Sequence, residues 1–453
     1  MTDTVVPLPE ALPHPETLAH PHTFPHPETL AELATERHGM FVHWGVYAKA
    51  ARHEWVKFRE KMTDEQYQIY LDTFDPDLYD PAEWAEIAYS AGMRSAVLTV
   101  KHHDGFCLWD SPLTDYSVVN TPHGADLVTP FVDAFRARGM SVGLYYSLVD
   151  WHHPEFTIDS LHPRKDDPEF RAAQAGRDMS IYREYMHAQI EEVLTKFGPL
   201  QLLFFDYSYD GGYVHQGNIV RDGKGAADWG SVELMEKIRR LQPRAMVNDR
   251  LRVSGDYQTP EQYQPEGPMT KDGVEVPWVA VQTLNGSWGY DRDNRNFKPV
   301  SMIVRMLIDT VSKNGNLLLN VGPDGRGRID PDTQALLAGL GEWMTLHNAS
   351  IYDAGASAFE PPRGTRYTQR GNRLYLHIFD WPFATLDLPG LADRVRYAQF
   401  MHDGSEVIRT VIDSAQPAYA VHRSGAAPGT LTIRLPIHRP DVEVPVIELF
   451  LKE

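Results

Sequence analysis

The chain has 453 residues and a formal net charge of −19, from 43 Lys and Arg against 62 Asp and Glu. A field of this sign repels polyanions, so nucleic acid is excluded as an expected partner. The single cysteine, Cys107, excludes an internal disulfide framework and any zinc or iron–sulfur site built from cysteines. A hydrophobic share of 42% is ordinary for a globular protein that buries its core without disulfides.

The start of the chain is rich in proline and histidine. Within residues 1–32 the heptapeptide PHPETLA occurs twice, at 13–19 and 25–31. Because proline interrupts helices, we expect an extended lead-in and assign the repeat no function. No basic segment followed by an apolar one is visible, as a signal peptide would require, and no stretch is apolar enough to span a membrane. We therefore expect a cytoplasmic enzyme with no membrane partner, and the oligomeric state stays open.

Residues 33–349 alternate short apolar runs with stretches of helical periodicity. Runs that are apolar on both faces are typical of parallel strands covered by helices. The predicted strands are 40–46, 96–101, 142–148, 202–206, 245–248, 279–284 and 317–321, and the predicted helices are 81–91, 127–138, 179–197, 231–241, 302–312 and 331–347.

This alternation predicts an α/β fold, a (β/α)8-like barrel. The alternation is irregular, because residues 251–277 have no helical pattern and predict only a short strand near 257–262. A doubly wound open sheet is the alternative, but no GxGxxG motif follows the first predicted strand.

Residues 350–453 have a different pattern, with apolar residues at every second position. The predicted strands are 373–379, 395–401, 407–412, 430–435 and 444–451, with turn residues between them. Period-two runs without helices predict a small antiparallel β-sandwich.

Polar and aromatic residues gather where the predicted barrel strands end, which is where barrels carry their active sites. His43, His102, His103, Tyr145, Asp206, Arg250 and Trp288 all lie at or shortly after such strand ends. Any one of these could be a structural residue, but their clustering on successive strands indicates an active site.

Asp206 is the most informative carboxylate, because it ends the apolar run Leu202-Leu203-Phe204-Phe205. A carboxylate there is costly unless it is paired or hydrogen-bonded. One interpretation is a structural aspartate that accepts backbone N–H groups. The other is a nucleophile that faces the pocket and is kept ionised by a cation such as Arg250, which ends the next strand.

The histidines raise the question of a metal site. Neither HxH on the first strand nor HExxH occurs in the sequence. His102 and His103 are adjacent, so on a regular strand they would point to opposite faces. We therefore predict no metal and no cofactor, and neutral histidines with tryptophans suit a polar, uncharged ligand such as a sugar.

Five segments resemble the α-L-fucosidases of glycoside hydrolase family 29. They are FVHWG at 41–45, HEW at 53–55, KHHDGFCLW at 101–109, GLYYSLVDW at 143–151 and NLLLNVGPDGRG at 316–327. The resemblance covers the barrel and implies a cofactor-free, retaining exo-glycosidase. Its substrate would be a fucosylated oligosaccharide or glycoside with a terminal α-L-fucosyl residue.

The resemblance also implies site residues. Asp206 matches the nucleophile, although many relatives have Trp before it and Gly after it, where this chain has Phe205 and Tyr207. Glu261 matches a motif that supplies the acid/base, and Glu54 is the alternative. Glu261 is favoured because a retaining pair needs its second carboxyl ~5–5.5 Å from the nucleophile. The residues implied to hold the sugar are His43, Glu54, Trp55, His102, His103, Tyr145, Arg250 and Trp288.

Two other functions stay open at this point. The chain could hydrolyse a related sugar, such as an α-L-galactoside that differs at C6. It could also be a sugar-binding relative without catalysis, although the presence of both Asp206 and Glu261 argues against that.

Overall fold

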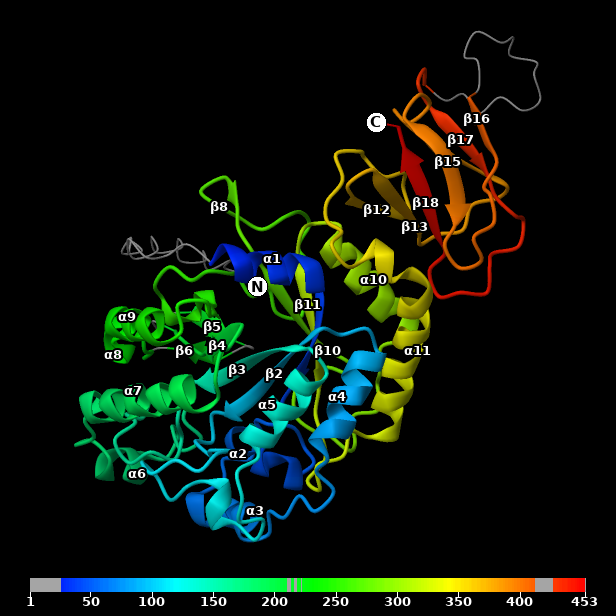
Figure 1. The fold of residues 1–453 in the computed structure, drawn as a ribbon. Coiled ribbons are helices and arrows are strands. Elements are labelled where there is room, and N and C mark those ends of the chain that lie inside the picture. The colour runs from blue at the N-terminus through cyan, green and yellow to red at the C-terminus, as the bar shows by residue number, and fades with distance from the viewer. Residues whose placement is uncertain (1–25, 210–212, 216–217, 221, 412–426, 453) are drawn as a thin grey trace, which may run out of the picture.

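The computed structural model describes residues 26–209, 213–215, 218–220, 222–411 and 427–452. Seven parallel strands form one curved sheet in the order β10-β11-β1-β2-β3-β4-β7 (Figure 1). Their bounds are β1 (His38–Val42), β2 (Ser95–Lys101), β3 (Ser141–Ser147), β4 (Leu202–Asp206), β7 (Met246–Val247), β10 (Val279–Thr283) and β11 (Asn316–Val321). Each overlaps a predicted strand, although β1 ends at Val42 and the predicted strand 40–46 is wrong at its end, where Val46 begins a 3-10 helix. The polar residues after the strands gather at one edge of the sheet.

The sheet closes into a ring through an irregular segment between its two edge strands. Tyr257 forms a bridge with Asn248 after β7, whereas Gln258 and Glu261 form parallel bridges with Trp278 and Val281 at β10. These single bridges occupy the sixth strand position of the barrel, where a short strand was predicted near 257–262. Pro260 lies inside this segment and has no N–H to donate to a ladder. The predicted (β/α)8-like barrel with irregular alternation is confirmed.

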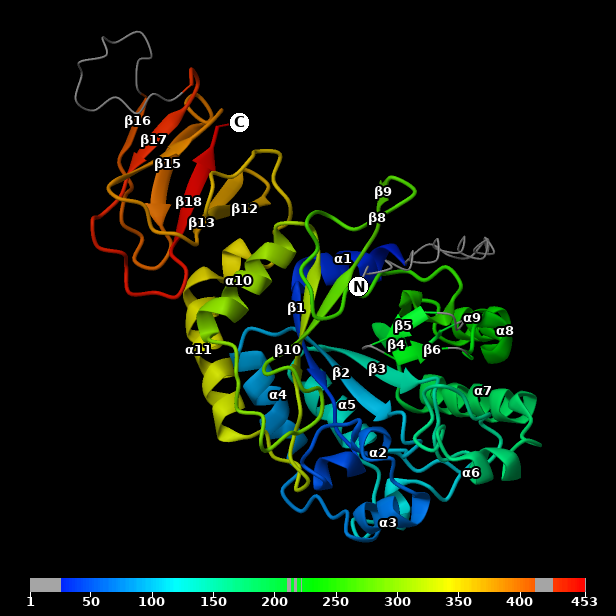
Figure 2. The same ribbon diagram turned by 180° about the vertical axis from the view of Figure 1, so that it is seen from behind.

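Helices cover the outside of the barrel, as the apolar strand faces require (Figures 1 and 2). The larger ones are α4 (Pro81–Ser90), α5 (Val128–Ala137), α7 (Met179–Lys196), α9 (Ser231–Leu241), α10 (Val300–Val311) and α11 (Pro331–His347). Asp80 caps α4 by accepting from the backbone N–H groups of Ala82 and Glu83. Shorter helices and hairpins occupy the loops: α2 (Val56–Arg59), α3 (Asp64–Asp72), α6 (Pro168–Ala173), α8 (Ala226–Trp229), β5 (Tyr213–His215) with β6 (Asn218–Val220), and β8 (Thr270–Lys271) with β9 (Val274–Glu275). Within the described part of the chain, no helix is both long and apolar enough to cross a membrane.

The expectation of an extended lead-in is wrong for its last residues. Helix α1 spans Pro27–Glu36 and includes the second copy of the heptapeptide from Pro27 onward. Proline is compatible with the first turn of a helix, where its missing N–H would be unpaired anyway. Thr29 and Leu33 are buried, and the Thr29 hydroxyl donates to the Arg244 carbonyl at 2.7 Å. Tertiary packing therefore decides the structure here, while residues 1–25 lie outside the described residues.

The C-terminal region is a β-sandwich, as predicted. One sheet has the order β12-β13-β18-β15 and the other β14-β17-β16, and apolar side chains from both sheets form a shared core. Bounds are β12 (Thr365–Arg370), β13 (Arg373–Ile378), β14 (Thr385–Leu388), β15 (Val395–Phe400), β16 (Arg409–Val411), β17 (Leu431–Arg434) and β18 (Val446–Leu451). Strands β12 and β14 were not predicted, and position 412 of the predicted strand 407–412 lies outside the described residues. The sandwich contacts the barrel's last helices, where Trp343 donates to the Val444 carbonyl at 2.9 Å.

Candidate active site

A cavity of about 510 Å³ opens at the carboxyl ends of the barrel strands. All ten residues proposed from the sequence line it: His43, Glu54, Trp55, His102, His103, Tyr145, Asp206, Arg250, Glu261 and Trp288. Residues that are up to 245 positions apart in the chain therefore converge, because each lies at or after the end of a barrel strand.

Asp206 ends β4 and is held by groups from both neighbouring strands. Its Oδ2 accepts from the Tyr145 hydroxyl at 2.8 Å, and its Oδ1 accepts from Arg250 at 2.5 Å. Burial raises the pKa of this carboxyl, but Arg250, His103 and the Tyr145 hydrogen bond together hold the pKa below its ordinary value. Asp206 is therefore an oriented, ionised carboxylate at the bottom of a cavity.

Arg250 joins the two carboxylates that a retaining mechanism needs. One terminal nitrogen donates to Asp206 and the other to Glu261 Oε2 at 2.7 Å, while Nε donates to Thr259 at 3.1 Å. The Glu261 side chain is 39% exposed and that of Asp206 only 12% exposed. One guanidinium thus brings a buried carboxylate and a solvent-accessible one to the same point of the cavity.

Glu54 has a different environment from Glu261. It is buried, and its Oε2 accepts from the Gly289 backbone N–H at 2.7 Å. Burial raises the pKa of Glu54, but contacts with His53 and the Gly289 amide outweigh burial and lower the pKa to about 2. A carboxylate fixed in this way is suited to accepting hydrogen bonds and poorly suited to donating a proton.

His43 is oriented by a side chain from the opposite part of the sequence. Asn320 donates from its amide nitrogen to the Trp288 carbonyl at 2.6 Å, so its Oδ1 is left to accept from His43 Nδ1, also at 2.6 Å. This assigns the proton of His43 to Nδ1 and leaves Nε2 as an acceptor. Burial lowers the pKa of His43 to about 4, so the ring is neutral.

His103 is oriented in the same manner by Ser147. The Ser147 hydroxyl donates to the Val149 carbonyl at 2.7 Å and therefore accepts from His103 Nδ1 at 2.6 Å. Nε2 of His103 lies 3.8 Å from Asp206 Oδ2, and burial lowers the pKa of His103 to about 4. The expectation that His102 and His103 point to opposite faces is wrong: both line the cavity, with ring centroids 4.0 Å apart. Strand β2 ends at Lys101, so the alternation of a strand does not reach them.

An apolar wall of the cavity packs against these polar groups. The ring of Phe41 lies 5.2 Å from that of Phe204 and 6.3 Å from that of Trp288, and Val281 also lines the cavity. Trp288 also packs on His43, with centroids 5.0 Å apart. The cavity therefore offers both oriented hydrogen-bonding groups and hydrocarbon, as sugar sites commonly do.

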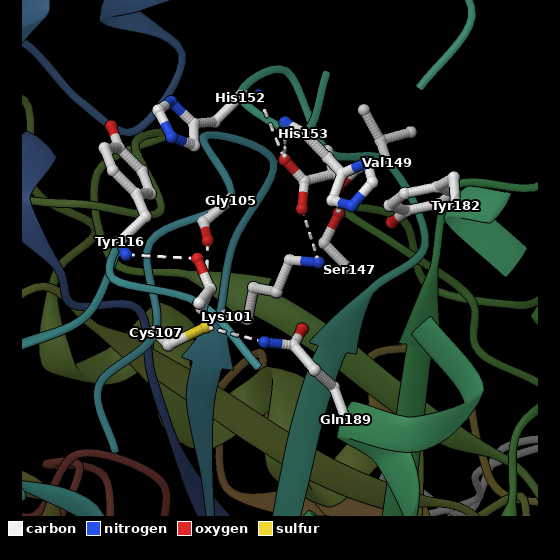
Figure 3. Close-up of polar contacts among 12 residues, drawn as sticks. Lys101, Gly105, Cys107, Tyr116, Ser147, Val149, His152, His153, Tyr182 and Gln189 are labelled. Atoms are coloured by element: carbon white, nitrogen blue, oxygen red, sulfur yellow. Dashed lines mark hydrogen bonds and ion pairs between the residues drawn. The ribbon is translucent and has the colours of Figure 1, made fainter. Parts of the chain in front are cut away.

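A buried polar cluster lies next to the cavity, centred on Lys101 (Figure 3). Lys101 Nζ contacts Asp150 Oδ2 at 2.7 Å and donates to the Tyr146 hydroxyl at 3.0 Å. Asp150 Oδ1 accepts from the backbone N–H groups of His152 and His153 at 3.0 and 2.8 Å. This cluster joins the ends of β2 and β3 beside His103.

The structure adds residues to the cavity that the sequence did not single out. They are Phe41, His53, Arg59, Phe204, Tyr207, Ser208, Gln262, Val281, Gly286 and Ser287. Tyr207 was noted only as a departure from the family pattern. Its φ of 69° places a bulky residue in the left-handed region, a strain of about 1–3 kcal/mol that concentrates at functional sites. Tyr207 N–H donates to Asp206 Oδ1 at 3.0 Å, so the strained backbone also orients the carboxylate.

The described residues contain no group of three or more His, Cys, Asp or Glu side chains arranged to bind a metal ion. The prediction that the protein needs no metal stays a prediction, for which a chelation experiment is given below.

Comparison with known proteins agrees with this geometry. The family model described as "Alpha-L-fucosidase" matches residues 27–349. α-L-Fucosidase isoenzyme 1 from Paenibacillus thiaminolyticus shares 41% identity, covers 94% of this chain and 99% of its own, and superposes with a TM-score of 0.85. Tissue α-L-fucosidase from Homo sapiens is 26% identical, covering 76% of this chain and 74% of its own.

A further solved structure shows the same fold at lower identity. It is an α-L-fucosidase of family 29 from Bacteroides thetaiotaomicron with a trapped covalent intermediate from 2-fluoro-fucosyl fluoride. It is 22% identical, covers 95% of this chain and 98% of its own, and has a TM-score of 0.80. Because the family model covers most of the chain, this protein belongs to the α-L-fucosidase family of glycoside hydrolases.

Proposed function

We propose that this protein hydrolyses terminal α-L-fucosyl residues from glycosides by double displacement, with Asp206 as nucleophile and Glu261 as acid/base. The observation that carries the proposal is the guanidinium of Arg250, which binds a buried carboxylate and an accessible one in a single sugar-sized cavity. The covalent intermediate trapped in the Bacteroides relative supports the same chemistry.

In the first step Asp206 attacks the anomeric carbon while Glu261 protonates the leaving oxygen. Glu261 is the more exposed of the two carboxyls that Arg250 binds, so solvent can exchange its proton. In the second step Glu261, now a carboxylate, deprotonates the water that hydrolyses the ester. Arg250 faces one negative charge at each stage, first on Asp206 and then on Glu261.

The neutral histidines and Glu54 supply contacts for the sugar's hydroxyls. His43 and His103 each present an unprotonated Nε2, because Nδ1 donates to a fixed acceptor. Ionised Glu54 adds another acceptor. Such groups orient an uncharged polyol without an unpaired buried charge.

The apolar wall favours a 6-deoxy sugar over its hydroxymethyl counterpart. Phe41, Phe204, Val281 and Trp288 offer hydrocarbon to a methyl group, whereas a C6 hydroxyl placed there would be left without a partner. This supports fucose over the alternative of an α-L-galactoside.

The test is hydrolysis of 4-nitrophenyl α-L-fucoside and α-L-galactoside under the same conditions, with the anomer of the released sugar followed by NMR. Fucoside hydrolysis with the α-anomer released first is the expected result. A preference for the galactoside would contradict the sugar assignment, and release of the β-anomer would contradict double displacement. No turnover of either, with L-fucose still bound, would indicate an inactive sugar-binding relative. The expected cytoplasmic location stays a proposal, testable by cell fractionation.

A further inference from the structure

One side of the cavity mouth is formed by the short helix α2 and by the residues that follow the nucleophile. Arg59, the last residue of α2, lines the cavity and is exposed. Among the described residues no carboxylate forms an ion pair with it. The neighbouring cations on the same segment are neutralised, since Arg52 binds Glu60 at 2.6 Å and Lys61 binds Asp166 at 2.8 Å.

A second cation, Lys165, packs against the same short helix and is also without an ion pair inside the described ranges. Lys165 Nζ lies 5.1 Å from the ring centroid of Phe58, the residue that precedes Arg59. In a chain with a net charge of −19, two cations without an ion pair at one short helix make the local field less negative than the chain's average.

Aromatic faces and a hydroxyl complete this side of the mouth. Trp55 and Tyr207 line the cavity with ring centroids 5.3 Å apart, and Tyr207 is held there in its left-handed conformation. The Oγ atom of Ser208 is buried and has no hydrogen-bond partner within the part of the chain that the structure describes. A buried hydroxyl and a guanidinium that line the same cavity, both without a partner among the described residues, are ready contacts for an anion.

The position fits the leaving group rather than the fucose. The hydroxyl-binding groups His43, His103 and Glu54 are all buried, whereas Arg59 and Glu261 are exposed at the mouth. A glycoside must cross this mouth with its aglycone, because the aglycone oxygen is protonated by Glu261.

We propose that Arg59, with Ser208 and the rings of Trp55 and Tyr207, forms an aglycone subsite for leaving groups that carry an acidic substituent such as a carboxylate. This inference rests on the proposed function and adds the class of aglycone. Neutral fucosides remain substrates, since the groups that hold the sugar and perform the reaction are separate from Arg59.

The experiment compares two aryl α-L-fucosides, 4-carboxyphenyl and 4-carbamoylphenyl, in the wild type and in Arg59→Gln. The readout is the ratio of kcat/KM for the acid to that for the amide. Intrinsic leaving-group reactivity is the same for every enzyme variant, so the change in this ratio isolates the contribution of Arg59. The ratio is expected to fall about fivefold at low ionic strength, with less change at high salt, as for a solvent-exposed charge pair.

Three further variants sharpen the test. Arg59→Lys should keep most of the preference, and Arg59→Glu should lower the ratio beyond Arg59→Gln. Arg52→Gln is the matched control, because Arg52 is paired with Glu60 and is not among the cavity-lining residues; its ratio should equal that of the wild type.

A ratio unaffected by Arg59→Gln would overturn the subsite, as would an equal fall in Arg52→Gln. Thermal unfolding shows whether Arg59→Gln is folded. If it is not, two other measurements decide: the acid-to-amide ratio in Arg59→Lys, and the dependence of the wild-type ratio on salt concentration. A wild-type ratio that is insensitive to salt would then refute the inference. Failure of the wild type to hydrolyse even the amide would refute the proposed function itself, so the two failures are distinguishable.

Discussion

Arg250→Gln should move the acid limb of the kcat/KM profile to higher pH. Burial alone raises the pKa of Asp206, and Arg250 is the largest of the influences that lower it. The nucleophile must be ionised, so activity is lost as pH falls through its pKa. Removing the cation raises that pKa, and the loss then begins at a higher pH.

The size of the effect follows from what Arg250 contacts. It donates to Asp206 at 2.5 Å, to Glu261 at 2.7 Å and to Thr259 at 3.1 Å. Removing one partner of a buried ion pair costs about 3–5 kcal/mol of stability, and the same energy lost from the transition state corresponds to roughly two to four orders of magnitude in rate. The Arg250 side chain is 21% exposed, so water replaces part of its charge stabilisation, and we expect a loss near a hundredfold in kcat/KM at neutral pH.

The assay is kcat/KM as a function of pH with an aryl fucoside of good leaving ability, so that protonation by Glu261 does not limit the rate. Arg239→Gln is the control, because it removes a buried Arg–Asp pair with Asp256 at 2.6 Å outside the cavity. That variant should lose stability but keep the wild-type acid limb. If Arg250→Gln keeps the wild-type limb, or loses less than about threefold, Arg250 does not control the ionisation of Asp206.

Four other predictions test the site and its surroundings. Asp206→Gly should lose several orders of magnitude in turnover, and azide should restore some of it with β-fucosyl azide as product; near-normal activity without azide would remove Asp206 from the mechanism. Glu261→Ala should hydrolyse substrates with good leaving groups far better than those with poor ones, whereas Glu54→Ala should mainly weaken binding, and the reverse pattern would exchange their roles. Lys101→Met should destabilise the fold by about 3–5 kcal/mol, because it leaves Asp150 buried and unpaired; adding Asp150→Asn should recover much of this in a denaturation curve, and no recovery would mean that packing rather than charge is at stake. Exhaustive chelation should leave activity unchanged, and a loss that zinc restores would contradict a metal-free enzyme.

The fold was predictable where local pattern and tertiary structure agree. The barrel strands are apolar on both faces, and Asp80 before Pro81 marks a helix start that the structure places at the same residue. The prediction of an extended chain was wrong for residues 27–32, which are helical. This helix is stabilised by the burial of Leu33 and Thr29 against distant parts of the chain, which the local sequence does not reveal. Strands β12 and β14 were missed because their burial alternates only weakly.

The membership of the site was more predictable than its geometry. Parallel strands bring their carboxyl ends to one edge, so residues after successive strands had to converge. The partners that set protonation come from far away: Asn320 orients His43 from 277 positions along the chain, and Gly289 fixes Glu54 from 235 positions away. No local spacing contains that information. Arg59 was missed for a related reason, since an exposed arginine on a short helix resembles any solvated cation until the cavity beside it is known.

The least regular part of the barrel is the part that brings the two carboxyls together. The backbone ladder between β4 and β7 ends at the pair of Leu203 with Val247, and the side chain of Asn248 then replaces it. Its Oδ1 accepts from the Phe205 N–H at 3.0 Å and its Nδ2 donates to the Phe205 carbonyl at 2.8 Å. The main chain is thereby free to turn into the short 3-10 helix Asp249–Leu251, which places Arg250 across from the end of β4.

The next segment, which carries Glu261, is also irregular. Glu261 is attached to β10 by a single bridge with Val281, and Gln262 after it has a φ of 59°. A regular sixth strand would alternate its side chains between the barrel interior and the helix layer. The broken strand instead lets Glu261 lie at the mouth, where it binds Arg250 and meets solvent. The irregular alternation seen in the sequence is therefore the structural condition for a buried nucleophile and an accessible acid to share one guanidinium.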